Sequence, residues 1–90
     1  MTSRHIEYVL TIAREGSITA ASRKLYVSQP SLSQTIKLIE RNLGAEIFNR
    51  NTEPISITPA GEKYIEAAQK VLEIEKTLRQ EIMQMNRNAV

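Results

Sequence analysis

The sequence contains no cysteine, no tryptophan and a single histidine, and all of its acidic residues are glutamates. Without cysteine the chain forms no disulfide, thiolate metal site or cysteine nucleophile, and it fits a reducing compartment. Metal binding would need a cluster of histidines and cysteines that is absent. His5 carries the only imidazole in the chain. Ser28 and Ser33 therefore have no other imidazole that could act as general base and activate them as nucleophiles. We therefore expect no catalytic residue, no metal and no cofactor, and a protein that is not an enzyme.

Long apolar runs are also missing. No stretch approaches the roughly 18 apolar residues of a membrane span. Glu7 and Thr11 interrupt the apolar stretch 6–13, so it does not match a signal-peptide core either. The three glycines are isolated and form no phosphate-binding loop. With 90 residues, of which 41% are hydrophobic, the chain has the composition of one globular domain. We expect it in the cytoplasm, with no membrane partner.

Positive charge is concentrated in the first half of the chain. Residues 1–50 carry seven basic side chains against four glutamates, and residues 51–90 carry five against six, so +3 and −1 give the net charge of +2. Clustered cations bind a polyanion favourably because counterions are released. The basic half suggests a nucleic-acid partner, and a lightly basic solvated surface remains the alternative reading of charge alone.

The apolar spacing predicts three helices in this half. Residues 3–15 form the first helix, which Gly16 ends, and a second, short helix follows and ends near Leu25. Their candidate caps are Thr2 or Ser3 for the first helix and Ser17 or Thr19 for the second. Ser28 caps a third helix over about 28–43, because Pro30 is tolerated only in a first turn. An inward stripe of this helix consists of Leu32, Ile36, Ile39 and Leu43. Two helices joined by a tight turn predict a helix-turn-helix.

After residue 45 the helical period is lost. The alternation in 55–58 and the polar tract 51–54 predict a small β-hairpin, a candidate wing. Thr58 followed by Pro59 then starts a long last helix. We expect a mainly α fold, a winged helix-turn-helix over 1–58 followed by a linker helix over 59–90.

The last helix carries an apolar seam that is longer than a small body needs. We expect it to pair two copies of the chain, and the alternative is that it packs only on its own domain. The residues expected to mediate this pairing are Val71, Ile74, Leu78 and Ile82.

The polar arc of the third helix is the expected DNA-binding face. A major groove admits one helix, and glutamine pairs bidentately with adenine. The residues expected to read bases are Gln29, Pro30, Ser33 and Gln34. Those expected to contact the DNA backbone are Ser28, Ser31, Lys37 and Arg41, because phosphate contacts position a helix without specifying sequence.

The order of these motifs resembles the DNA-binding domain of LysR-type bacterial transcriptional regulators. The segments that carry the resemblance are Val27-Ser28-Gln29-Pro30-Ser31-Leu32-Ser33, Leu43-Gly44, Phe48 with Arg50, and Thr58-Pro59-Ala60-Gly61. The resemblance covers nearly the whole chain. It implies a homodimer on an interrupted palindromic promoter site, with Arg50 on the DNA backbone or minor groove. It also implies that a small-molecule inducer binds only a full-length protein with an effector domain, so this chain would be a DNA-binding fragment or a short form.

Two positions depart from the family pattern. The family often has arginine at the position of Gln34, and its wing is usually more basic than a loop that holds Glu53 and Pro54. Two other functions that do not involve catalysis are alternatives for this chain. One is a dimerising adaptor whose DNA face is not used, and the other is a winged-helix regulator of a different family. Salt-dependent DNA binding distinguishes a LysR-type DNA-binding domain from the adaptor. The dimer geometry and the half-site spacing distinguish it from a winged-helix regulator of another family.

Overall fold

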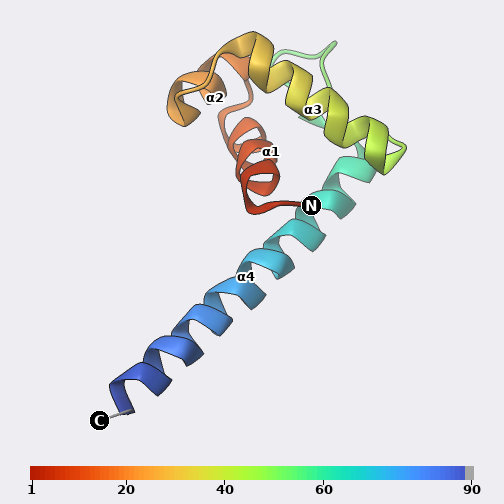
Figure 1. Ribbon diagram of the computed structural model, residues 1–90. Coiled ribbons are helices and arrows are strands. Elements are labelled where there is room, and N and C mark those ends of the chain that lie inside the picture. Colours follow the sequence, from red (N-terminus) through yellow and green to blue (C-terminus); the bar gives the residue numbers. More distant parts are fainter. Residues whose placement is uncertain (89–90) are drawn as a thin grey trace.

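The structure is a computed structural model that describes residues 1–88. In chain order its elements are α1 (Ser3–Glu15), α2 (Ile18–Leu25), α3 (Gln29–Leu43), β1 (Phe48–Asn49), β2 (Ser56–Ile57) and α4 (Pro59–Asn88). The three short helices form a body, from which α4 extends far beyond (Figure 1), so the molecule measures 56 × 26 × 20 Å. The predicted winged helix-turn-helix with a long last helix is confirmed. The last two positions of the predicted range 59–90 lie outside the described residues.

The predicted ends of the first three helices are confirmed, and local capping explains them. Thr2 caps α1 by accepting a hydrogen bond from the His5 amide at 3.1 Å, and Ser17 caps α2 by accepting one from the Ala20 amide at 3.1 Å. Gly16 ends α1 in the left-handed region, with φ of 69°. Glycine adopts this conformation at little steric cost, so its position ends the helix.

The core lies where α1, α2 and α3 meet the hairpin and the first turns of α4. Its largest fully buried side chains are Phe48, Ile6, Ile12, Leu32, Ile36, Ile47 and Val9. One member of the predicted inward stripe of α3 is wrong, because Leu43 is 46% exposed. It is the last residue of α3 and lines an open depression beside His5 and Tyr64, which leaves it partly exposed, whereas Glu40 is buried one turn earlier.

The hairpin is shorter than the alternating sequence suggests. β1 and β2 pair antiparallel over two residues each, with Phe48 opposite Ile57. The Ile55 amide donates a hydrogen bond to the Gly16 carbonyl at 3.0 Å, which fixes the hairpin against the end of α1. Thr58 then caps α4 by accepting a hydrogen bond from the Gly61 amide at 2.9 Å.

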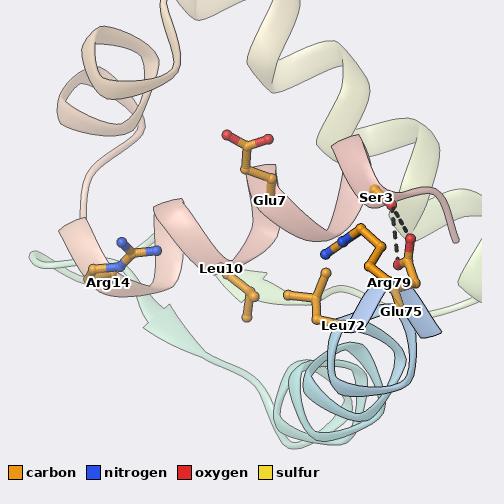
Figure 2. Close-up of a pocket in the computed structure, with 7 residues that line it drawn as sticks. All are labelled: Ser3, Glu7, Leu10, Arg14, Leu72, Glu75 and Arg79. Atoms are coloured by element: carbon orange, nitrogen blue, oxygen red, sulfur yellow. Dashed lines mark hydrogen bonds between the residues drawn. The ribbon is translucent and has the colours of Figure 1, made fainter. Parts of the chain in front are cut away.

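Near its middle, α4 passes across α1 (Figure 2). Leu10 and Leu72 point toward one another across a groove between the two helices (Figure 2). At one end of this groove the Ser3 hydroxyl donates a hydrogen bond to the Glu75 carboxylate at 2.9 Å. These contacts fix the direction in which α4 leaves the body. Across residues 1–88, no helix combines the length and the apolar character that a bilayer crossing needs.

Tyr64 couples the stability of the fold to alkaline pH. Its hydroxyl is buried without a hydrogen-bond partner among the described residues, and burial raises its pKa above the ordinary value of 10.0. The unfolded chain therefore loses this proton at lower pH than the folded chain does. The stability that the neutral phenol confers is complete below pH 10.0 and falls as the pH rises through the folded-state pKa. Urea unfolding followed by circular dichroism should show Tyr64→Phe losing less stability than the wild type above pH 10.0.

Near neutral pH, Tyr64→Phe should unfold within about 1 kcal/mol of the wild type, because it removes a hydroxyl that has no partner. Tyr26→Phe is the matched control, since that side chain is 96% exposed, and it should retain the wild-type decline. Equal alkaline declines in Tyr64→Phe and wild type would contradict the prediction.

Candidate nucleic-acid interface

The turn between α2 and α3 fixes how the two helices cross. Tyr26 ends α2 in the left-handed region with φ of 57°, and the Val27 amide donates a hydrogen bond to the Ser22 carbonyl at 3.1 Å. Ser28 then caps α3 by accepting a hydrogen bond from the Ser31 amide at 3.2 Å. Ala21, which is fully buried, keeps α2 close to the body. The result is a helix-turn-helix with α3 across one side of the body (Figure 1).

One face of α3 is buried and the opposite face is open. Leu32 and Ile36 are fully buried, and Ile39 nearly so. Most of the predicted DNA contacts lie on the exposed part of the helix and its cap, namely Ser28, Gln29, Pro30, Ser31, Gln34, Lys37 and Arg41. Ser33 differs from these, because it is half-buried at the edge of the face. The structure therefore brings the predicted residues together along one side of α3.

This face carries positive charge that no carboxylate of the described part of the chain neutralises. Among residues 1–88, the ion pairs are Arg50 with Glu40 and Lys70 with Glu66. Lys37 and Arg41 are in neither pair. Both side chains are exposed, so they are available to a phosphate group.

Arg50 has a partner within the chain that the sequence alone did not predict. Its guanidinium donates a hydrogen bond to Oε1 of Glu40 at 3.1 Å. The other oxygen of Glu40 accepts hydrogen bonds from the backbone amides of Ile47 at 2.7 Å and Phe48 at 3.3 Å. Glu40 is 8% exposed. One carboxylate thus joins α3 to the first strand of the hairpin and holds the guanidinium end of the Arg50 side chain at the start of the wing.

The wing loop is ordered by its own side chains. Thr52 Oγ1 donates to the Pro54 carbonyl at 2.9 Å and accepts a hydrogen bond from the Ser56 amide at 3.0 Å. The Asn51 amide donates to Asn49 Oδ1 at 3.0 Å. These bonds order the loop that carries exposed Glu53, so the loop presents a negative charge beside the ion-paired Arg50.

A second candidate surface lies on α4. Ile74 and Leu78 are 68% and 56% exposed, and Ile82 and Met85 lie on the same side farther along the helix. Val71 is half-buried, at the point where this stripe leaves the body. The predicted pairing residues therefore form one continuous apolar stripe. It begins at the body and follows the part of α4 that the body does not cover.

Comparison with known proteins agrees with this geometry. Residues 3–62 match the family described as bacterial regulatory helix-turn-helix protein, lysR family. The chain is similar to the HTH-type transcriptional regulator TfdS of Cupriavidus pinatubonensis, with 36% identity over 77 residues, 86% of this chain and 26% of that protein. It is also similar to the HTH-type transcriptional regulator BudR of Klebsiella aerogenes, with 42% identity over 72 residues, 80% of this chain and 50% of that protein. These relatives bear the names of transcriptional regulators, which are not enzymes.

A solved DNA complex has the same fold. The crystal structure of the BenM DNA-binding domain on catB site 1 DNA superposes with a TM-score of 0.90 and 29% identity, covering 100% of this chain and 97% of that chain. By contrast, the chain spans about a quarter of the length of TfdS. The similarity to BenM extends over the body and α4 alike.

Proposed function

We propose, from the premise that the chain belongs to the LysR family of bacterial regulatory proteins, that it binds an interrupted palindromic promoter site as a homodimer. It is a helix-turn-helix DNA-binding domain of that family. The finer proposal places α3 in the major groove and the wing on the backbone or minor groove. The main support for this proposal is the open polar face of α3. Buried Leu32 and Ile36 anchor the opposite face to the body, so the polar face is directed outward.

The residues of this face have different proposed roles. Gln29 and Gln34 read bases with their amides, Ser33 with its hydroxyl, and Pro30 packs its methylene groups against thymine methyls. The backbone contacts come from Ser28, Ser31, Lys37, Arg41 and Arg50. We propose that 1–58 forms the DNA-binding unit and 59–90 the linker helix.

Gln29 provides the sharpest test of base reading. On duplexes enriched from a random pool, Gln29→Ala should weaken binding by about 1–3 kcal/mol while leaving binding to scrambled duplex unchanged. Lys37→Ala should weaken both and lower the salt dependence, because it removes a phosphate contact. Fluorescence anisotropy titrations at several salt concentrations measure both effects.

A matched control is Gln69→Ala, which makes the same substitution at an exposed position of α4. It should bind both duplexes as the wild type does. If Gln29→Ala discriminates between enriched and scrambled duplex as well as the wild type, Gln29 does not read bases.

The pairing of two chains is proposed from the exposed stripe on α4. Ile74, Leu78, Ile82 and Met85 are exposed in the single chain, and burying a large apolar side chain of this kind contributes about 1.5–3 kcal/mol. The proposed interface residues are Val71, Ile74, Leu78 and Ile82. An interface along this stripe sets the distance between two α3 helices and hence between two half-sites.

Leu78→Asp should convert the dimer to a monomer in sedimentation velocity, because it places a charge in the middle of the apolar stripe. Gln80→Asp is the matched control, two residues along and on the opposite side of α4, and should leave the dimer intact. Both variants should keep the circular dichroism spectrum of the wild type. A Leu78→Asp protein that sediments as the wild-type dimer would place the interface elsewhere.

We propose two further properties of the regulator as a whole. It acts on promoter DNA in the bacterial cytoplasm, at the nucleoid, because DNA is its proposed partner. A small-molecule inducer acts on a full-length form that carries an effector domain. The small share of TfdS that this chain spans supports this division of roles.

A further inference from the structure

The side chain of Gln29 is not free in the folded protein. Its amide nitrogen Nε2 donates a hydrogen bond to the hydroxyl oxygen of Thr19. Thr19 is the second residue of α2 and Gln29 is the first residue of α3, so the bond connects the starts of the two helices of the helix-turn-helix. Both residues are exposed, which leaves them accessible to DNA.

Both partners of this hydrogen bond stand on fixed backbone. The Ser17 cap fixes the first turn of α2, and the Ser22 hydroxyl donates to the Thr19 carbonyl at 2.8 Å. The Ser28 cap fixes the first turn of α3. Thr19 is β-branched, so its χ1 angle has few alternatives in a helix. The Thr19 hydroxyl therefore offers Gln29 an acceptor at a defined position.

The hydrogen bond to Thr19 determines which groups of the Gln29 amide remain available to a base. A glutamine amide has one oxygen and two N–H groups. One N–H is used by Thr19, and the oxygen and the second N–H remain. That remaining pair is what adenine requires, since adenine presents the N6 amino donor and the N7 acceptor in the major groove. Without Thr19 the amide could rotate and present its oxygen and nitrogen in either order.

We infer that Thr19 is a positioning residue that orients the Gln29 amide to read an adenine in each half-site. This inference rests on the proposed function of Gln29. Thr19 acts through Gln29 and need not touch a base itself. It sits on the helix that precedes the recognition helix, outside the set of residues proposed to read bases.

The first experiment needs no DNA. In nitrogen–proton correlation spectra of the free protein, the Gln29 side-chain amide is assigned as the pair of signals that Gln29→Ala removes. Thr19→Val is close to isosteric and lacks the hydroxyl, so it should shift this pair toward the positions of exposed glutamine amides. Thr19→Ser retains the hydroxyl and should leave the pair near its wild-type position. An unshifted pair in Thr19→Val would overturn the inference.

The second experiment measures discrimination. The ratio of affinities is determined for the enriched duplex and for the same duplex with the adenine pair replaced by G·C. Thr19→Val should lower this ratio by about five- to tenfold, and Thr19→Ser should stay within about twofold of the wild type. The double variant Thr19→Val with Gln29→Ala should discriminate no worse than Gln29→Ala alone, because both changes remove the same contact. Thr19→Ala repeats the test if Thr19→Val unfolds at lower temperature than the wild type.

Three results of this second experiment would overturn the inference, and they differ in what they say of the proposed function. If Gln29→Ala lowers the ratio and Thr19→Val does not, Gln29 reads the base without Thr19. If Thr19→Val weakens all duplexes equally, even with Gln29→Ala present, then Thr19 contacts a phosphate itself. If Gln29→Ala leaves the ratio unchanged, the base-reading role of Gln29 fails, and the inference fails with it.

Discussion

Replacing Glu40 with alanine is expected to lower the free energy of unfolding by about 2–4 kcal/mol. The carboxylate is buried and accepts hydrogen bonds from two backbone amides and from Arg50. Its removal leaves the amides of Ile47 and Phe48 without this acceptor. Arg50 contributes less to the loss, because a third of its side chain is exposed and solvent screens its charge. Urea unfolding followed by far-UV circular dichroism measures the change.

Glu46→Ala is the matched control for this prediction. Glu46 lies in the same connection between α3 and the hairpin, and its side chain is exposed. Its loss should change stability by no more than about 0.5 kcal/mol. The stability loss of Arg50→Ala should lie between those of the two glutamate variants, because the Glu40 carboxylate still accepts hydrogen bonds from both backbone amides. Similar stabilities of Glu40→Ala and Glu46→Ala would show that the buried carboxylate does not hold the hairpin.

Gly61→Ala should destabilise the protein by about 3 kcal/mol, although alanine is normally better than glycine in a helix by about 1 kcal/mol. A Cβ atom at this position would lie 2.1 Å from the Ile47 carbonyl oxygen and 2.8 Å from Cγ2 of Ile57. Backbone cannot move aside as a flexible side chain does, so α4 and the hairpin would have to separate. Thermal unfolding gives the change directly as a lower Tm.

Gly44→Ala separates this clash from the ordinary cost of replacing a glycine. Gly44 ends α3 with φ of 82°, and a Cβ there would meet no atom within 4 Å. Its replacement should cost about 1–2 kcal/mol, from the left-handed backbone alone. A Gly61→Ala protein as stable as the wild type would mean that the helix does not approach Ile47 this closely.

Local signals explain why the helix boundaries could be predicted from the sequence. The start of α3 follows from Ser28 and Pro30, and its end from Gly44, because each residue acts through its own backbone and immediate neighbours. The start of α4 follows from Thr58 and Pro59 for the same reason. Such residues need no knowledge of the tertiary structure.

What the sequence did not predict depends on contacts between distant residues. The helical period places Leu43 on the inward stripe, but only the edge of the body lies beside it, and the side chain stays partly exposed. Glu40 appears as one more polar residue of α3 until the hairpin folds over it. Arg50 was predicted from the family resemblance as a DNA contact, and its bond to Glu40 became visible only in the structure. Glu40 and Arg50 are ten residues apart in the sequence, and this spacing alone is only a weak signal of such a bond.

The central claim is that the open face of α3 reads DNA in two related half-sites. The measurement that tests it most directly is selection of bound duplexes from a random pool by the purified chain at several salt concentrations, followed by sequencing. A dimeric reader of this kind should show steeply salt-dependent retention and enrich two half-sites related by a two-fold axis, about one or two helical turns apart. Failure to retain any duplex at low salt would contradict it, and the adaptor function would then become the better explanation of the exposed stripe on α4.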